Sequence, residues 1–275
     1  RLNGIYHFIL MDNIIFGNPP KASYKESKLK LFNFIDPVLN IQIAVSLNKP
    51  KNPSKVCILY SHSNSETLDS INKNLEQLSI QLNCLVFSYD YLGFGETQGS
   101  PTEQSIVAVA NSVFVLIRQS YPEHQLILWG RAIGSVPTTR IAAQNEVEGC
   151  ILESPIASAM RAVSLSASLF GGMDGYDSTP FMNQIKCAVL VMHGTQDKIV
   201  NISNGETLFL LHENQSTFSN LQSSKIGDHQ LFKGKKSWMC KVEGASHVNI
   251  LTQFMPGVVE VFQKFKSALI DGITE

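Results

Sequence analysis

The chain has 275 residues and a formal net charge of -1, and only 16% of its residues are charged while 44% are hydrophobic. Soluble domains carry about 25% charged residues, so this surface draws its polarity mainly from Ser, Asn, Gln and Thr. The neutral balance excludes a protein built around the basic surface that nucleic-acid binding needs, the apolar content excludes wholesale disorder, and the length suits one large α/β domain.

The first residues form an apolar stretch, residues 4–16, which is interrupted by His7, Asp12 and Asn13. It is shorter than the ~20 residues needed to span a bilayer, and it lacks the basic region and cleavage site of a signal peptide. We therefore expect residues 1–28 to pack on the domain or lead into it, and residues 29–275 to form the domain. The alternative is that the segment lies on a membrane or on a partner.

Short apolar runs alternate with helical patterns along the rest of the chain. Runs of the strand type occur at 30–35, 41–47, 56–60, 85–89, 126–129, 150–152, 188–192 and 238–242. Apolar residues spaced three and four apart predict helices at 67–82, 104–118, 132–144 and 253–269. Strands separated by helices indicate βαβ units, so the pattern predicts a mostly parallel, doubly wound α/β sheet.

Two stretches interrupt this alternation. Residues 155–186 are rich in Ser, Gly and Ala and are predicted to form a small cap over the sheet, with Asp177 as an anchor. Residues 215–236 are polar and contain Lys233, Lys235 and Lys236 near their end. We expect a flexible surface insertion with a solvated basic tip, and the alternative for this tip is attraction to a membrane surface.

The cysteines number five and are far apart, without a C-x-x-C pair: Cys57, Cys84, Cys150, Cys187 and Cys240. Each lies in an apolar run that is typical of a strand, so we expect buried thiols that behave as small hydrophobic groups. This argues against a disulfide framework and against a zinc site, and it favours a reducing, cytoplasmic location. With no metal-ligand spacing elsewhere, we expect neither a metal nor another cofactor.

The most informative motif is GRAIG at residues 130–134, directly after the predicted strand at 126–129. A strand, a Gly-x-x-x-Gly turn and a helix together form the frame of the nucleophile elbow, G-x-S-x-G. Gly130 and Gly134 allow the sharp turn and the close approach of helix and strand. The central residue, which carries the nucleophile in such elbows, is Ala132.

Two later strands lead into an acid and a base in the Ser-Asp-His order that accompanies this elbow. Asp197 follows one strand in HGTQDKIV, and His247 follows another in GASH. Both loops leave the carboxyl ends of parallel strands, where open α/β sheets form their sites. Asp197 is therefore expected to orient His247, which would act as a general base for a hydroxyl at position 132.

The oxyanion hole of such a site needs two backbone N–H groups. The sequence predicts that Ile133, after the elbow centre, and Asn64, in the loop after an early strand, supply them. Ser135 lies within the following helix and is expected to point away from the turn, so it is a poor substitute for the nucleophile. His62 and His193 are expected to orient nearby backbone, and Asp90 to accept hydrogen bonds from loop amides.

Seven segments carry a resemblance to a known family: FGNPPKASY (16–24), YSHSN (60–64), FSYDYLGFGETQGSPTE (87–103), GRAIGSVPT (130–138), LESPIASAMRA (152–162), HGTQDKIV (193–200) and GASH (244–247). On these the chain resembles the α/β-hydrolases, and within them the group of Bem46-like proteins and ABHD17-type protein depalmitoylases. The resemblance implies an α/β-hydrolase fold and an acyl thioesterase or esterase, with an acyl ester or an S-acylated protein as substrate. It places the serine at position 132, the acid at Asp197 and the histidine at His247.

The chain departs from this family in three ways. Ala132 removes the nucleophile, Ser63 replaces a common glycine, and residues 1–56 contain no cysteine that could be lipidated. Ala132 is either an engineered replacement, which the intact acid, base and glycines favour, or a natural loss, which a start at Arg1 instead of Met favours. In the second case the chain is a pseudo-hydrolase that binds an acyl chain or a protein partner. Peripheral membrane contact, acyl length and oligomeric state stay open.

Overall fold

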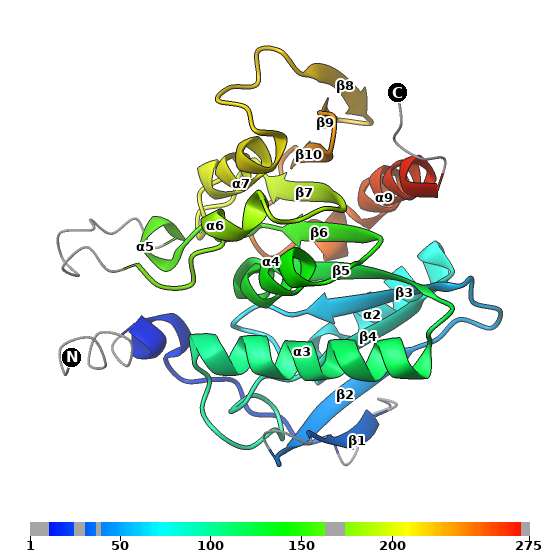
Figure 1. The fold of residues 1–275 in the computed structure, drawn as a ribbon, viewed down its shortest axis with the longest axis vertical. Helices are drawn as coiled ribbons and strands as arrows, with labels where there is room; N and C mark the ends of the chain where they lie inside the picture. Colours follow the sequence, from blue (N-terminus) through cyan, green and yellow to red (C-terminus); the bar gives the residue numbers. More distant parts are fainter. Residues whose placement is uncertain (1–10, 25–30, 37–39, 163–173, 271–275) are drawn as a thin grey trace.

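Ten strands form one sheet in the part of the chain that the computed structural model describes, which comprises residues 11–24, 31–36, 40–162 and 174–270 (Figure 1). The strands are β1 (Leu31–Ile35), β2 (Gln42–Asn48), β3 (Val56–Ser61), β4 (Leu85–Tyr89), β5 (Gln125–Arg131), β6 (Gly149–Glu153), β7 (Ala188–Gly194), β8 (Gln222–Ile226), β9 (His229–Lys233) and β10 (Ser237–Val242). Their order across the sheet is β1-β2-β4-β3-β5-β6-β7-β10-β9-β8.

The central strands β4, β3, β5, β6, β7 and β10 are parallel, and both edges are antiparallel. Every residue of β3, β4 and β6 is buried. Parallel strands are covered on both faces and therefore read as continuous apolar runs. This explains why short runs such as VCILY were enough to predict them.

Helices cover the two faces of the sheet (Figure 1). They are α2 (Leu68–Leu82), α3 (Glu103–Ser120), α4 (Ser135–Gln144), α5 (Ala159–Ala162), α6 (Thr179–Met182), α7 (Ser203–Glu213), α8 (Ile250–Gln253) and α9 (Met255–Ile270), with the short 3₁₀ turn η1 (Ala132–Gly134) after β5. Side chains of α3, α4 and α7 share one apolar core, and those of α2 and α9 share the other. The predicted strands and the four predicted helices are all present, with ends that differ by a few residues.

Polar side chains determine where the first long helices begin. Thr102 and Ser105 form a reciprocal capping box at the start of α3. At the start of α2 the Asp90 carboxylate accepts the Leu68 N–H at 3.1 Å. Asp90 was expected to accept from loop amides, but its described donors are this helix-terminal N–H and the Tyr24 hydroxyl. The bond to Leu68 joins the end of β4 to the helix that follows the β3 loop.

The expectation of a flexible insertion at residues 215–236 is wrong for most of its length. Residues 222–233 form the strands β8 and β9, which pair as an antiparallel hairpin and extend the sheet beyond β10. The turn between them uses Gly227 at φ 57°, a backbone conformation that glycine adopts easily. Phe218 packs on Phe209 and Phe232, so this polar stretch is anchored by aromatic contacts. Pairing with β9 also satisfies the otherwise open edge of β10.

The cysteines differ in part from the expectation. Cys57, Cys150 and Cys240 lie within strands, whereas Cys84 and Cys187 directly precede strands. All five are free thiols, and Cys187 is partly exposed. Burial raises the pKa of Cys57 and Cys84 to about 12, so these thiols stay protonated and unreactive near neutral pH.

The N-terminal segment lies against the domain in its described part. Residues 11–16 are helical and lie beside the first turn of α3, where the Asp12 carboxylate accepts the Glu103 N–H (Figure 1). Met11 and Phe16 are buried, and the Phe16 ring packs edge-on against Phe94 and Tyr176. The described residues leave out residues 1–10 and 25–28 of this segment.

The predicted cap is described only in part, because residues 163–173 lie outside the described residues. In the cap, Asp177 accepts the Thr179 N–H at 2.9 Å.

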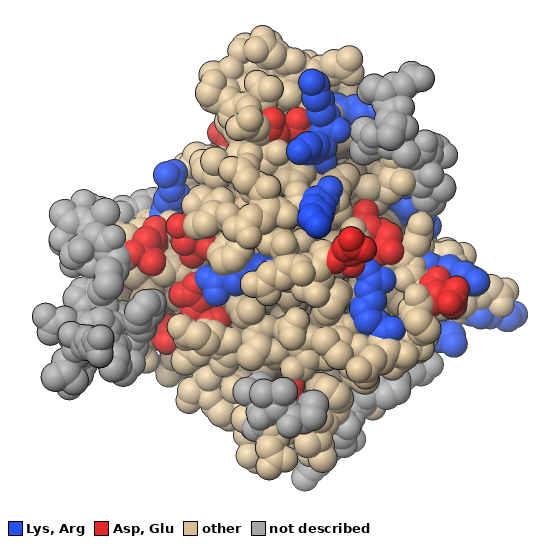
Figure 2. Space-filling model, viewed as in Figure 1, with Lys and Arg blue, Asp and Glu red and all other residues tan. Residues whose placement is uncertain are grey.

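The surface matches the low charge content. On the face shown in Figure 2, basic and acidic side chains stand in small separate groups between uncharged surface. No helix among the described residues is long and apolar enough to cross a bilayer.

Candidate active site

Four loops gather at one edge of the sheet because the strands that precede them run parallel in its central part. They follow β3, β5, β7 and β10, and they carry Asn64, Ala132, Asp197 and His247. Strands in one parallel sheet end at the same edge, which is where α/β sheets place their sites. The structure therefore brings the loops with the predicted site residues to one edge.

Residue 132 has the backbone conformation of an elbow nucleophile. Ala132 has φ 48°, in the left-handed region, and it begins the 3₁₀ turn η1 between β5 and α4. A residue with a Cβ pays about 1–2 kcal/mol in this region, and such strain is concentrated at functional sites. The turn thus presents its central Cβ as an elbow does, although that Cβ carries no nucleophile.

The two elbow glycines are required because backbone atoms approach both positions too closely for a Cβ. A Cβ on Gly134 would overlap the carbonyl oxygen of Ser61 at the end of β3, and a Cβ on Gly130 would overlap the carbonyl oxygen of Gly134. Absence of side chains at both positions lets the start of α4 pack directly against the loop after β3. The elbow and the predicted oxyanion loop are therefore in contact.

Gly134→Ala is expected to lower the free energy of unfolding by roughly 2–3 kcal/mol, because the added methyl must displace the backbone of β3. Gly175→Ala is the matched control, since its Cβ would meet Met11 and Glu103 at ordinary contact distances of 3.4 and 3.5 Å. Urea unfolding followed by circular dichroism measures both variants. Equal stability of the two variants would contradict the close approach.

Asp197 and His247, the predicted acid and base, are joined by a hydrogen bond. The Nδ1 atom of His247 lies 2.7 Å from Oδ2 of Asp197. The other carboxylate oxygen accepts the N–H groups of Ile199 and Val200, both at 2.9 Å. With Nδ1 engaged, Nε2 is the nitrogen of His247 that remains for proton transfer, as in a catalytic triad.

The Asp197 carboxylate is held in its ionised form. Burial by itself would raise the pKa of this group, but hydrogen bonds from His193 and His247 outweigh burial and hold the pKa well below its usual value. The His193 ring contributes through Nε2, which lies 3.3 Å from Asp197 Oδ2 and donates to the Val200 carbonyl at 2.9 Å. His193 therefore orients the backbone of this loop, as predicted.

In the loop after β3, the Ser63 N–H has a hydrogen-bond acceptor and the Asn64 N–H has none among the described residues. The Ser63 N–H donates to Glu66 Oε2 at 2.8 Å, and His62 Nδ1 lies 2.8 Å from the Ser63 carbonyl. The Asn64 side chain donates to the Ile15 carbonyl, so the N-terminal helix lies against this loop. Within the described ranges no acceptor is found for the Asn64 N–H, which supports Asn64 over Ser63 as the predicted second oxyanion donor.

The neighbouring serines are occupied by structural hydrogen bonds. Ser135 is fully buried, donates to the Ala132 carbonyl at 2.6 Å and accepts the Ile156 N–H at 3.2 Å. The Ser61 hydroxyl lies 2.7 Å from the Tyr89 hydroxyl. Neither hydroxyl is free to replace a nucleophile at position 132.

Sequence reasoning missed a buried charged group beside the elbow. The Arg131 guanidinium pairs with Glu66, lies 3.5 Å from the carboxylate of Glu153, and donates to the His247 carbonyl at 2.9 Å. Trp129 Nε1 donates to Glu153 at 2.9 Å. Burial raises the pKa of Glu153 to about 7, against the opposing effects of Arg131 and of the Trp129 hydrogen bond. The available signal was Glu153 itself, a glutamate that directly follows the apolar run at 150–152 and ends β6.

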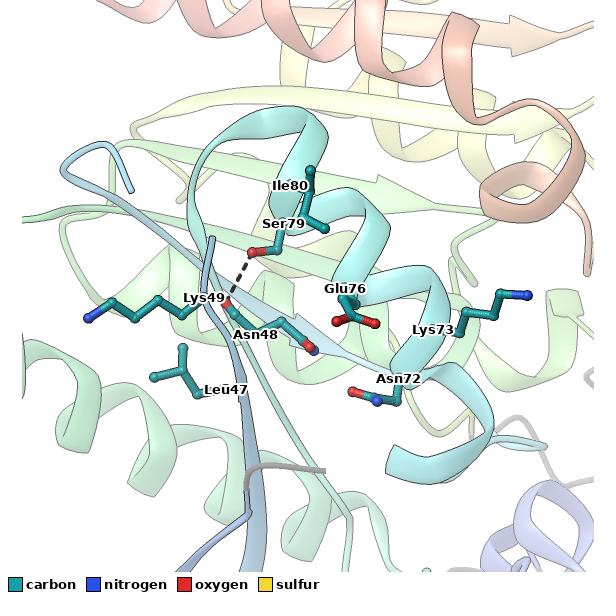
Figure 3. A pocket seen from close by; sticks show the side chains of 8 residues that line it. All are labelled: Leu47, Asn48, Lys49, Asn72, Lys73, Glu76, Ser79 and Ile80. Atoms are coloured by element: carbon teal, nitrogen blue, oxygen red, sulfur yellow. Dashed lines mark hydrogen bonds between the residues drawn. The ribbon is translucent and has the colours of Figure 1, made fainter. Parts of the chain in front are cut away.

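A polar hollow lies away from this edge of the sheet. It encloses about 210 Å³ between β2 and α2, where Ser79 donates to the Asn48 carbonyl at 3.1 Å (Figure 3). Its lining contains none of the predicted site residues, and its Lys49 and Lys73 side chains extend away from one another. Among the described residues, no group of three His, Cys, Asp or Glu side chains could hold a metal ion.

No protein-family profile matches the chain. It is 32% identical over 170 residues to the alpha/beta hydrolase domain-containing protein aho-3 of Caenorhabditis elegans, a match that covers 61% of this chain and 51% of that protein. It is 33% identical over 159 residues to the human alpha/beta hydrolase domain-containing protein 17B, covering 57% of this chain and 55% of that protein. The match thus spans about half the length of these relatives.

Solved structures show the same fold at low sequence identity. The Pyrococcus furiosus esterase Pf2001 superposes with a TM-score of 0.69 at 13% identity, over 92% of this chain and 97% of that chain. Est1E of Butyrivibrio proteoclasticus, solved with ferulic acid bound, gives 0.61 at 15% identity over 87% and 99%. The expected α/β-hydrolase fold, with a largely parallel mixed sheet and flanking helices, is therefore confirmed.

Proposed function

We propose that this chain, which belongs to the α/β-hydrolase superfamily and is distantly related to the ABHD17 and aho-3 proteins, holds a site for acyl esters or acyl thioesters that retains its acid–base pair and lacks its nucleophile. The observation that carries the proposal is the 2.7 Å hydrogen bond between His247 and Asp197, at the sheet edge where residue 132 sits in an elbow conformation. With Ala132 in place, the site binds an acyl group and does not transfer it.

The missing step follows from the atom at position 132. A serine hydroxyl there would attack the acyl carbonyl carbon while its proton passed to Nε2 of His247, and that proton would then go to the leaving alcohol or thiol. The N–H groups of Ile133 and Asn64 would bind the carbonyl oxygen as it became negative. The methyl of Ala132 has no lone pair and no transferable proton, so the bond to the carbonyl carbon cannot form.

Two exposed apolar side chains beside the acid and the base support an apolar substrate. Ile199 is 63% exposed and lies two residues after Asp197, and Val248 is 56% exposed and directly follows His247. A contiguous exposed apolar patch can mark a ligand-binding site, and we propose that Ile199 and Val248 form part of one beside the Asp197–His247 pair. An acyl chain is an apolar ligand that such a patch would bind. The resemblance to depalmitoylases further implies that the acyl chain belongs to an S-acylated protein, at a membrane surface in the cytoplasm.

Binding of a thioether analogue of an S-palmitoylated peptide tests this function on the chain as it stands. We expect fluorescence anisotropy to show saturable binding that the unacylated peptide does not show. Ile199→Lys is expected to weaken binding about tenfold, because burying such a side chain is worth about 1.5–3 kcal/mol. Ile80→Lys is the matched control, since Ile80 is 60% exposed on α2 at the hollow of Figure 3.

Two results would count against the proposal. One is equal affinity for the acylated and unacylated peptides, which would favour a binding module for a protein segment. The other is an equal loss of affinity in Ile199→Lys and Ile80→Lys, which would show that the acyl chain binds away from the sheet edge that carries Asp197 and His247.

A further inference from the structure

The Arg131 side chain contacts three segments of the candidate active site. It extends from the elbow itself, one residue before Ala132, and only 7% of it is exposed. Its Nη1 pairs with Glu66 after the oxyanion loop, its Nη2 donates to the His247 carbonyl at 2.9 Å, and its Nε lies 3.5 Å from Glu153 at the end of β6. One guanidinium therefore joins the nucleophile turn, the oxyanion loop and the histidine loop.

Glu66 extends this connection to a specific amide. One carboxylate oxygen pairs with Arg131, and the other accepts the Ser63 N–H at 2.8 Å. Because its N–H donates to this carboxylate, Ser63 has no backbone donor left for a ligand. The same hydrogen bond fixes the loop in which Asn64 is the next residue. Arg131 therefore pairs with the carboxylate that binds the amide next to Asn64 in the predicted oxyanion loop.

Glu153 lies on the Nε side of the guanidinium, where its Oε1 is 3.5 Å from Nε and no hydrogen bond joins the two atoms. Its side chain has no exposed surface, and it is itself fixed by the Trp129 indole N–H at 2.9 Å. Buried ion pairs contribute little net stability because desolvation offsets their attraction. The planar fork of arginine donates in several fixed directions at once, which a lysine ammonium on a flexible stem does not do. We therefore expect this network to fix the relative positions of the groups around Arg131 and to add little to the stability of the fold.

We propose that Arg131 is a positioning residue that sets the His247 loop and the Ser63–Asn64 loop relative to residue 132. It acts through the His247 carbonyl on one side and through Glu66 on the other. The inference rests on the proposed function only in assigning these loops to a reaction site, because the contacts themselves exist in the chain with Ala132.

The first test uses NMR on the chain with Ala132, where no turnover is needed. The readouts are the exchange rates with solvent of the His247 Nδ1–H, which faces Asp197, and of the Ser63 N–H. Arg131→Gln is expected to accelerate both at least tenfold relative to amides of the central strands. Arg140→Gln is the matched control, since Arg140 forms a similar ion pair with Glu103 on the α3 and α4 helices.

A second variant keeps the test decisive if Arg131→Gln does not fold. Arg131→Lys preserves the charge, and its single ammonium cannot span Glu66 and the His247 carbonyl together. It is expected to fold and to accelerate exchange at one or both of the two positions. Unchanged exchange at both, or an increase equal to that of the strand amides, would overturn the proposal and leave Arg131 with a structural role only.

The rate arm uses the Ala132→Ser background and separates positioning from binding. Adding Arg131→Lys is expected to lower kcat for an acyl ester about 100-fold, the loss that a misplacement of about 1 Å produces, while KM stays within threefold. Adding Arg140→Gln is expected to leave kcat unchanged. A rise in KM with constant kcat would contradict positioning. Absence of any turnover in Ala132→Ser itself would sink the proposed function, and the exchange rates would still decide the role of Arg131.

Discussion

Ala132→Ser is expected to raise the hydrolysis of p-nitrophenyl acyl esters by on the order of 10⁴- to 10⁶-fold, since removal of the serine from a complete triad costs about 10⁶-fold in kcat. The backbone of residue 132 already has the conformation of an elbow centre, with φ 48°, so the substitution adds one oxygen atom to a Cβ that is in place. His247 is hydrogen-bonded to Asp197 through Nδ1 at 2.7 Å, so its Nε2 is the nitrogen that would accept the serine proton. Steady-state rates and stoichiometric labelling by a fluorophosphonate measure the gain.

Ala132→Gly is the matched control for this gain. Glycine adopts a positive φ without the cost that alanine carries and also lacks a hydroxyl. It is expected to be as inactive as the parent chain and to remain unlabelled. A serine variant that folds, yet neither reacts with the probe nor exceeds the glycine variant in rate, would refute the assignment of this edge as a hydrolase site.

Asp197→Asn in the Ala132→Ser background is expected to lower kcat by about 10⁴-fold, the loss seen when the acid of a serine-protease triad is replaced by its amide. The carboxylate accepts from His247 Nδ1 and so leaves Nε2 free to take the serine proton. An amide nitrogen at that position would favour the opposite tautomer. Asp177→Asn is the control, because Asp177 accepts the Thr179 N–H in the cap and does not contact His247. Equal rates for the two variants would contradict the role of Asp197.

The same substitution has an expected signature in the pH dependence of stability. Hydrogen bonds from His193 and His247 outweigh burial and lower the pKa of Asp197 in the folded chain. The ionised carboxylate therefore stabilises the fold above about pH 4, near the pKa of an unfolded aspartate, and this contribution is lost as the pH falls towards the folded pKa. Asp197→Asn should be less stable than its parent near pH 7, and the difference should shrink below pH 4. Urea unfolding across this range measures it.

Much of the fold was predictable because its signals are local. The runs that became β3, β4 and β6 are buried on both faces, so they are continuously apolar in sequence. The elbow was predictable for a similar reason, since a turn with φ 48° between a strand and a helix needs glycines two residues before and after it. Amphipathic spacing predicted the helices that became α2 and α9, whereas only the structure shows that both pack into one apolar core on the same face of the sheet.

The hairpin of β8 and β9 was not predictable from its own residues. QSSKI and HQLFK contain few apolar side chains, and only the edge of β10 and the ring of Phe218 make them a stable part of the sheet. A local pattern cannot report an edge that is formed by a strand further along the chain. For the N-terminal segment the sequence predicted packing on the domain but not the contact with Asn64, which joins residues 49 positions apart.

The sequence by itself determined the class of fold, the elbow, the order of acid and base, and the absence of a hydroxyl at position 132. These follow from residue identity and from periodicity, which are local properties of the chain. Only the tertiary structure decided that Asp197 and His247 meet at 2.7 Å, that Glu66 consumes the Ser63 amide, and that Arg131 reaches the His247 carbonyl. The last contact joins residues 116 positions apart. Such contacts depend on how parallel strands bring distant loops to one edge, so no spacing in the sequence encodes them directly.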